Sequence, residues 1–397
     1  MKKSIIAIIL YFLIINIFLP GVYYLIYGFN PIYSDLTDQP ALIKSFFLIV
    51  CPFSLSLLVL FILPNKDDKI TPNINGGPVT EFFYFSIFLK LVTFYYFGGF
   101  ASVIAGEANG SFGNYLSLFF NPFILLMILL FAQKKRSSAL MAVLFYLISV
   151  TLSGSRSGIL AIIFVFLIGY SFVQFNQYRK RILKFVLYAL IIAPVIFIYA
   201  TSLRGYTDSI SISVVLDQIV GRMSVLETSM LPVHFYDNQL NLDLFYDKYS
   251  FINQFKLSLD ALVPGQLFDF DVMPNNYYRA IFMGYDQAFV FENYLSINLT
   301  LPVYLYLKYG YFTLILTPLY ILGFFKVVKL FKNYPLIAIL FLSVFYNLLY
   351  FFDWVFIFTQ LYKAILTIIL LKAYILFRTE FKRGVIKLKQ ENLAKFY

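Results

Sequence analysis

Long stretches of apolar residues without a single charge recur along this chain, and they restrict its possible folds more than any other feature. Two of them cover residues 4–19 and 45–64. About 20 apolar residues in a row are enough for a helix to cross a bilayer. Inside a bilayer only helices and closed barrels satisfy the backbone hydrogen bonds, and these stretches lack the two-residue alternation of barrel strands. The pattern therefore predicts an all-α membrane protein.

Composition supports the same conclusion. The chain has 397 residues, of which 61% are hydrophobic and 13% are charged, whereas soluble domains have about 25% charged residues. A soluble fold of this size could not bury so much apolar surface, so the bilayer is the expected solvent. The single cysteine, Cys51, cannot form an internal disulfide, and the sequence contains no Cys/His cluster. Neither a metal nor a cofactor is therefore expected.

The apolar stretches predict a polytopic protein with about ten transmembrane helices. We expect the spans at residues 4–28, 41–63, 82–105, 115–132, 138–152, 158–175, 185–202, 310–326, 335–352 and 355–377. The first span follows two lysines, as the core of a signal peptide would, but the small-residue cleavage pattern does not follow it. We therefore expect an uncleaved anchor.

The basic residues fall on alternate connections between these spans, which predicts their orientation. One set of connections, with the two ends of the chain, contains Lys2, Lys3, Lys66, Lys69, Lys134, Lys135, Arg136, Arg179, Lys180, Arg181, Lys184, Lys326, Lys329, Lys332 and the tail from Arg378. The opposite short connections contain only Arg156. Both termini are therefore predicted in the cytoplasm, with the protein in an inner membrane. The net charge of +11 reflects this bias, so nucleic acid is not an expected partner.

This topology divides the chain into five parts. Residues 1–202 form seven spans, and residues 203–296 form one large loop on the outer, periplasmic face. Residues 297–309 are apolar but interrupted by polar residues, which predicts an interfacial or re-entrant helix. Residues 310–377 form the last three spans, and residues 378–397 form a basic cytoplasmic tail.

The large outer loop is predicted to contain an amphipathic helix. Phe251, Phe255 and Leu259 recur at helical spacing, and Lys256 stands four residues before Asp260. Such a helix would lie on the membrane surface.

The most distinctive short motif is Ser153-Gly154-Ser155-Arg156-Ser157-Gly158, in a predicted outer turn. Small residues allow a phosphate group to approach closely, and hydroxyl and amide groups donate to it. Arginine binds phosphate through two parallel N–H groups. The alternative interpretation is a tight turn whose arginine extends to lipid headgroups. The residues by themselves leave both interpretations open.

The segment from Leu152 to Leu160, followed by a basic inner loop, one span and a large outer loop, resembles the O-antigen polymerase (Wzy-type) family, within the superfamily that includes the O-antigen ligases. The resemblance implies a glycosyltransferase that moves a growing glycan from undecaprenyl diphosphate to a sugar hydroxyl of another lipid-linked repeat unit. Its implied partners are the undecaprenyl-diphosphate-linked oligosaccharide, membrane lipids and, as a further candidate, a chain-length regulator. No metal or cofactor is implied.

This chemistry requires positive charge to hold the diphosphate and a base to activate the attacking hydroxyl. The predicted diphosphate-binding residues are Arg156, Arg204, Arg222, Arg279, Ser155 and Ser157. Interfacial contacts with lipid headgroups or surface ion pairs are the alternative roles of the loop arginines. The predicted glycan-binding residues are Asn276, Tyr277 and Tyr278, for which packing within the loop is the alternative. Glu292 is the first candidate base, with Asp286 and Asp208 as alternatives.

Two other functions remain as alternatives. Related ligases have a His-Asn pair just before the helix that follows the large loop, whereas this chain has Glu292-Asn293 there, which argues against a ligase. His234 lies in the middle of the loop and is interpreted as a solvated residue. A transporter or lipid-linked sugar flippase commonly shows two related halves, and no such repeat is evident here.

Overall fold

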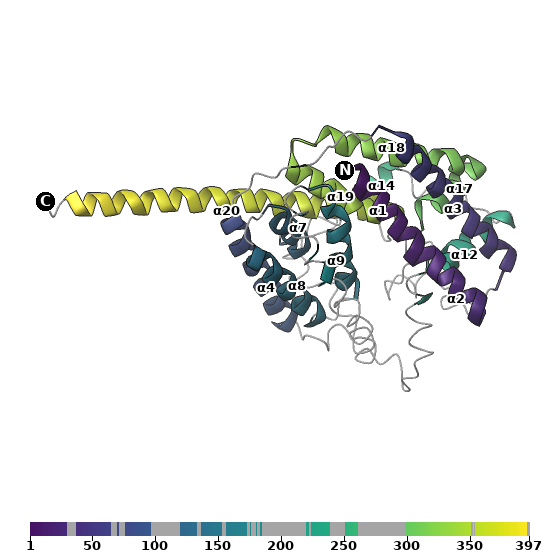
Figure 1. Ribbon diagram of the computed structural model, residues 1–397, viewed down its shortest axis with the longest axis horizontal. Helices are drawn as coiled ribbons and strands as arrows, with labels where there is room; N and C mark the ends of the chain where they lie inside the picture. The colour runs from purple at the N-terminus through teal and green to yellow at the C-terminus, as the bar shows by residue number, and fades with distance from the viewer. Residues whose placement is uncertain are drawn as a thin grey trace. The chain divides into compact units, whose positions relative to one another are not determined.

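The structure, a computed structural model, describes residues 1–29, 37–64, 70, 76–96, 120–132, 136–152, 156–172, 175, 180, 183–184, 220–221, 224–238, 251–260, 299–350, 352 and 354–394. Within these residues the regular elements are helices (Figure 1), apart from an isolated β-bridge between Ile70 and Phe172.

The chain divides into two compact units, which we describe separately. The first comprises Met1–Lys69, Thr207–Tyr334 and Phe341–Leu361, and the second comprises Ile70–Tyr206, Pro335–Leu340 and Tyr362–Tyr397. Two helices, α19 (Pro335–Tyr350) and α20 (Trp354–Ala394), contribute residues to both units.

Four helical stretches in the described part of the chain are long and apolar enough to cross a membrane. They are Lys2–Tyr27, Gln39–Ile62, Leu301–Leu330 and Ile357–Val385. Shorter apolar helices cover Pro122–Phe131, Leu140–Val150 and Pro335–Tyr350. The protein is therefore an all-α, membrane-embedded protein, as the apolar stretches predicted. The ten spans and their orientation stay predictions.

The first of these stretches contains an irregular turn near its middle. It consists of α1 (Lys2–Leu13), a π-helical turn (Ile14–Phe18) and α2 (Leu19–Tyr27). Pro20 has no N–H group, so it cannot donate to the carbonyl of Asn16 four residues earlier. That carbonyl accepts the N–H of Val225, from the predicted outer loop, at 3.2 Å.

Helix α3 (Gln39–Ile62) runs antiparallel to the first stretch. The rings of Phe12 and Phe53 lie 5.3 Å apart, and those of Phe18 and Phe46 lie 5.8 Å apart. Residue numbers thus rise in one helix as they fall in the other. Helices α12, α17 and α18 of the first unit pack against α3.

Helix α17 (Leu301–Tyr309) occupies most of the region predicted as an interfacial or re-entrant helix, and a 3₁₀ turn (Gly310–Phe312) leads from it into α18 (Thr313–Leu330). The stretch is not one straight rod, because the Thr313 hydroxyl donates to the carbonyl of Pro302 at 2.7 Å. Eleven residues of straight helix would separate the two by about 16 Å. The chain reverses at Gly310, which has a φ of 57° that favours glycine.

Helix α14 (Phe251–Asp260) lies where the residue spacing predicts an amphipathic helix. Its buried face contains Gln254, Leu257 and Ser258, while Phe255 remains 45% exposed. The Gln254 side chain accepts the N–H of Trp354 at 3.2 Å. Phe255 also contacts Phe358 of α20, with ring centroids 5.6 Å apart, so part of the predicted apolar face packs against the protein.

The second unit contains α4 (Gly76–Tyr96), α7 (Pro122–Ala132), α8 (Arg136–Leu152) and α9 (Arg156–Gly169). Residues 124–131 of α7 are buried throughout, so α7 lies in the core of this unit. Helix α9 ends at Gly169, whereas the predicted span extended to residue 175. The chain turns there, and Phe172 stacks on Phe131 with ring centroids 4.3 Å apart. A tertiary contact of this kind has no signature in the apolar pattern.

Candidate functional site

The predicted diphosphate-binding motif leads into helix α9. Arg156 and Ser157 are the first two residues of that helix. The first N–H groups of any helix have no partner within the helix and favour a bound anion. The other predicted site residues lie outside the described part of the chain: Ser155, Arg204, Asp208, Arg222, Asn276, Tyr277, Tyr278, Arg279, Asp286 and Glu292. Their roles stay predictions.

A cluster of charged and aromatic side chains connects three helices of the first unit. It consists of Asp38, Lys44, His234, Asp237 and Tyr306, and we call it the polar cluster. Asp38 and Lys44 lie at the start of α3. His234 and Asp237 lie in the last turn of α12 (Leu226–Asp237), a helix of the predicted outer loop, and Tyr306 lies on α17. Three segments that are distant in the sequence therefore meet here.

The first part of the polar cluster is an ion pair supported by aromatic rings. The Lys44 Nζ atom lies 2.7 Å from each carboxylate oxygen of Asp237. The Tyr306 hydroxyl donates to Asp237 Oδ1 at 2.9 Å. The same Nζ atom lies 5.0 Å from the ring centroid of Tyr306 and 5.3 Å from that of Tyr311, within the range of a cation–π contact. These contacts hold the C-terminal end of α12 against α3 and α17.

The second part of the polar cluster pairs a carboxylate with an imidazole. Asp38 precedes the first turn of α3, and its Oδ1 atom accepts the Ala41 N–H at 3.0 Å, as a helix N-cap does. Its Oδ2 atom lies 2.5 Å from Nδ1 of His234. The Ala41 N–H and then the imidazole hold the pKa of the Asp38 carboxyl below its ordinary value, because both stabilise the ionised form.

The second ring nitrogen of His234 faces Asn238, the residue that follows α12. Nδ2 of Asn238 lies 3.2 Å from Nε2 of the imidazole and donates to the backbone carbonyl of His234 at 2.9 Å. A side-chain amide nitrogen can only donate. The same Nδ2 atom lies 3.4 Å from Nδ1, so this contact does not assign the tautomer. The ionised Asp38 carboxylate can only accept, so in the neutral ring the proton lies on Nδ1, toward Asp38, and Nε2 is the acceptor.

The interpretation of His234 as a solvated loop residue is wrong. His234 lies in a helix, its side chain is 25% exposed, and a carboxylate contacts its ring. Asp38 before Gln39-Pro40 is a recognisable helix-start signal. No sequence signal, however, links two residues that are 196 positions apart.

Helix α12 reaches about halfway along the first apolar stretch. Its N-terminal end lies beside Asn16, near the middle of Lys2–Tyr27, because the N–H of Val225 donates to the Asn16 carbonyl. Its C-terminal end lies beside Asp38, just before the first turn of α3. Twelve helical residues extend about 18 Å, roughly half a membrane-spanning helix of this length. The predicted loop thus includes a helix that packs along the spans.

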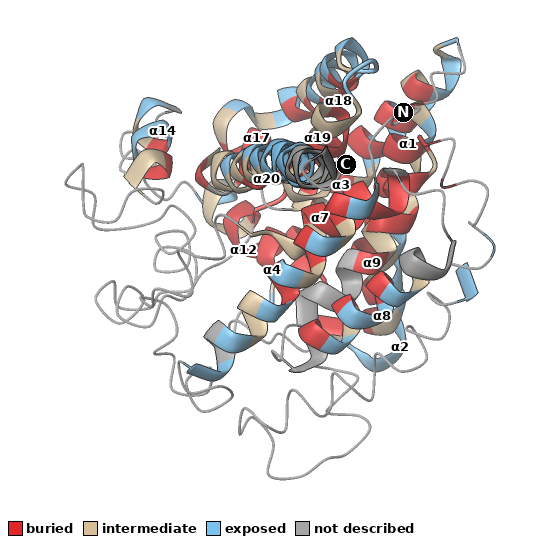
Figure 2. Cartoon of the chain, turned by 90° about the vertical axis from the view of Figure 1, so that its left-hand side faces the viewer, coloured by how far each residue is buried: buried red, intermediate tan, exposed pale blue. Residues whose placement is uncertain are grey.

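Helix α12 is buried over residues 226–233 (Figure 2). This buried part contains Glu227, Thr228 and Ser229, of which Glu227 is fully buried in the first turn. A carboxylate is stabilised at a helix N-terminus by the helix dipole. Ionisable groups at such depth in membrane proteins usually serve a function.

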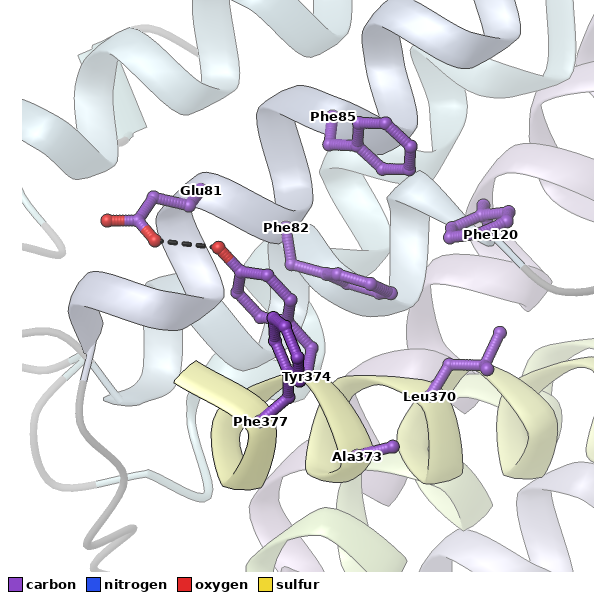
Figure 3. Close-up of a pocket in the computed structure, with 8 residues that line it drawn as sticks. All are labelled: Glu81, Phe82, Phe85, Phe120, Leu370, Ala373, Tyr374 and Phe377. Atoms are coloured by element: carbon purple, nitrogen blue, oxygen red, sulfur yellow. Dashed lines mark hydrogen bonds between the residues drawn. The ribbon is translucent and has the colours of Figure 1, made fainter. Parts of the chain in front are cut away.

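A groove of about 490 Å³ lies between α4 and α20 in the second unit (Figure 3). Its walls include Phe82, Phe85, Phe120 and Leu370. The carboxylate of Glu81, at one end, accepts the Tyr374 hydroxyl at 2.8 Å and pairs with Arg378. Because its acid is already paired and its walls are apolar, this groove suits a hydrocarbon chain better than a reacting group.

Among the described residues, no group of three or more His, Cys, Asp or Glu side chains could hold a metal ion. No protein-family model, no curated protein and no solved structure matches the chain. Conclusions about function therefore rest on the residues of the chain itself.

Proposed function

We propose that this protein is a glycosyltransferase that polymerises oligosaccharide repeat units for O-antigen or a related bacterial surface polysaccharide. It transfers a glycan from an undecaprenyl-diphosphate carrier to a sugar hydroxyl of another lipid-linked unit. The observation that carries the proposal is the motif around Arg156, which leads into a helix of an all-α membrane protein. A helix start beside an arginine is a favourable place for a phosphate group.

The proposal includes a ten-span topology in the inner membrane. Both termini are cytoplasmic, and residues 203–296 form the large periplasmic loop. The distribution of lysine and arginine over alternate connections supports this orientation. The sugar of the donor must face the compartment in which the polymer grows. In this topology Arg156 lies at the outer boundary of the membrane, where it can bind the diphosphate of that donor.

In this mechanism, arginine side chains stabilise the leaving group. The bond between the anomeric carbon and the diphosphate oxygen breaks, and its electron pair leaves with the diphosphate. Fixed guanidinium groups stabilise the transition state because they face the negative charge that develops on the diphosphate. The proposed diphosphate-binding set consists of Arg156 with Ser155 and Ser157, together with Arg204 and a contribution from Arg222 or Arg279.

The large loop supplies the acceptor side. Asn276, Tyr277 and Tyr278 form the proposed glycan-binding stretch, because amides bond to sugar hydroxyls and tyrosine rings pack on sugar faces. Glu292 is the first carboxylate candidate for the base, with Asp286 and Asp208 as alternatives. A chain-length regulator is a further candidate partner.

Deletion of the gene tests the proposal directly. Loss of a polymerase leaves a single repeat unit attached to the lipid core, visible by electrophoresis of the extracted polysaccharide. A ligase would instead leave no attached repeat unit. Translocation of lipid-linked sugar by the purified protein in vesicles, without a new glycosidic bond, would identify a flippase.

Arg156 is tested by substitution in the same strain. Arg156→Ala should abolish long-chain polysaccharide while the protein still accumulates in the membrane. Arg156→Lys should also lose most of the product, because an ammonium group cannot form the two parallel hydrogen bonds of a guanidinium. Arg136→Ala is the matched control, since Arg136 is the first residue of α8 as Arg156 is of α9, and it lies on the predicted cytoplasmic side. Normal chain lengths in both Arg156 variants would refute this site.

A further inference from the structure

The contact between Asp38 and His234 has the arrangement of a general base and the group that positions it. A carboxylate bound to Nδ1 fixes the tautomer and orientation of an imidazole and stabilises the imidazolium that forms when the ring accepts a proton. Here Nδ1 of His234 lies 2.5 Å from Asp38, which leaves Nε2 as the atom that can accept a proton.

Asp38 is itself held in place by the backbone. Its Oδ1 atom accepts the Ala41 N–H, so only Oδ2 turns toward the imidazole. The pKa of its carboxyl lies below the ordinary value, so the group is ionised at neutral pH. It can therefore stabilise a positive charge on the ring without taking up the proton.

The other charged groups of the polar cluster do not compete for this role. Lys44 and Asp237 pair with each other, and Tyr306 donates to Asp237. They fix the end of α12 and hence the position of His234, three residues before Asp237. His234 and Asp38 are only 25% and 23% exposed, so they are open to a ligand but largely shielded from water.

The location suits an acceptor sugar under the topology proposed above. Asp38 lies in the predicted outer turn between the first two spans, and α12 belongs to the large outer loop. The exposed Asn238 amide nitrogen lies 3.2 Å from Nε2 and 3.4 Å from Nδ1, and a sugar hydroxyl could displace it. Imidazole is the side chain best suited to exchange a proton near neutral pH.

We propose that His234 is the general base that deprotonates the acceptor hydroxyl and that Asp38 positions it. The inference rests on the proposed polymerase function and replaces Glu292 as the first candidate for the base. The acceptor oxygen attacks the anomeric carbon of the donor, its proton passes to Nε2, and the carbon–diphosphate bond breaks. The imidazolium, facing the Asp38 carboxylate, then releases the proton to water.

The test uses a strain that lacks the gene, complemented with variants of the full chain. His234→Ala should reduce the polysaccharide to one repeat unit at an unchanged level of membrane protein. Asp38→Asn should reduce polymer synthesis at least tenfold, because asparagine still caps the helix but cannot stabilise the imidazolium. Glu380→Gln on α20 is the control, since it changes an exposed carboxylate outside the polar cluster and should leave chain length unchanged.

Chemical rescue separates a base from a structural residue. Added imidazole should restore polymer synthesis by purified His234→Ala protein acting on lipid-linked repeat units. It should not restore synthesis in the His234→Ala/Asp38→Asn double variant, because the added ring then has no carboxylate to orient it.

Different results would refute the polymerase function and the role of His234 as the base. If deletion of the gene leaves polymer length normal, the proposed function is wrong. If deletion leaves one repeat unit but His234→Ala and Asp38→Asn both give normal chain lengths, the function stands and His234 is not the base. Inactive His234→Ala protein that imidazole does not rescue, at a normal protein level, would also overturn the role of His234.

Discussion

The ion pair between Lys44 and Asp237 should contribute about 1 kcal/mol to the stability of the first unit. Two N–O distances of 2.7 Å are typical of a strong, charge-assisted contact. The two side chains, however, are 27% and 36% exposed, so water screens part of the attraction. Exposed pairs contribute about 0.2–1 kcal/mol, and hydrogen bonds between membrane helices average about 0.6 kcal/mol with a maximum near 1.7. The partly shielded pair belongs near the upper part of that range.

A double-mutant cycle isolates this energy. Lys44→Met removes the charge and shortens the side chain by one heavy atom, and Asp237→Asn keeps the shape of the side chain and an oxygen for the Tyr306 hydroxyl. The two single variants and the double variant would be unfolded reversibly in mixed detergent micelles. Trp354, the single tryptophan of the chain, belongs to the same unit and gives the fluorescence signal.

An internal control comes from the ion pair between Glu380 and Arg383 on α20. Its side chains are 68% and 72% exposed, and one turn of helix separates them, so their coupling should be only about 0.3 kcal/mol. A coupling between Lys44 and Asp237 no larger than this would refute the idea that the pair fixes α12. A coupling above about 3 kcal/mol, as in fully buried pairs, would mean that the contact is more desolvated than its exposure indicates.

Two further predictions concern the same unit. Gly310→Ala should destabilise the protein by about 1–3 kcal/mol, because alanine resists a positive φ. Gly323→Ala in α18 should be neutral or slightly stabilising in the same unfolding assay, because a Cβ added there would meet no atom within 4 Å. The lowered pKa of Asp38 means that its stabilising contribution is present above the unfolded-state value of about 3.9 and is lost as the pH falls through the folded-state value. Asp38→Asn should therefore lose less stability than the native chain between pH 5 and pH 3. An equal loss would contradict the stabilisation of the Asp38 carboxylate by the Ala41 N–H and by His234.

The fold class was predictable because it follows from the apolar composition of stretches of about 20 residues, which is a local property of the sequence. The helices Lys2–Tyr27 and Gln39–Ile62 lie where the apolar pattern placed the first two spans, and α14 lies where the spacing of Phe251 and Phe255 predicted a helix. These are local signals. Solvent preference and helical periodicity are sufficient to produce them, and no distant residue is needed.

The polar cluster was not predictable for the opposite reason. Neither Asp38 nor His234 differs, in its local sequence, from a solvated residue next to a helix. Their pairing arises only because α12 packs beside α3, and that packing depends on contacts between segments about 200 positions apart. The end of α9 at Gly169 was not predictable for the same reason, because the chain that follows packs through Phe172 on Phe131 of α7.

Helix α12 also explains a feature of the first span that is unfavourable in isolation. A half-length helix beside a span begins far from water, where its first N–H groups need partners. Pro20 leaves the Asn16 carbonyl without the usual donor four residues later, and Val225 supplies one from the start of α12. The hydroxyl of Ser224 accepts the next N–H, that of Leu226, at 3.1 Å. Pro20 removes one hydrogen bond from the first helix. The Asn16 carbonyl then accepts the N–H of Val225 at the start of α12. This hydrogen bond therefore links the irregular turn in the first span to the start of the buried helix α12.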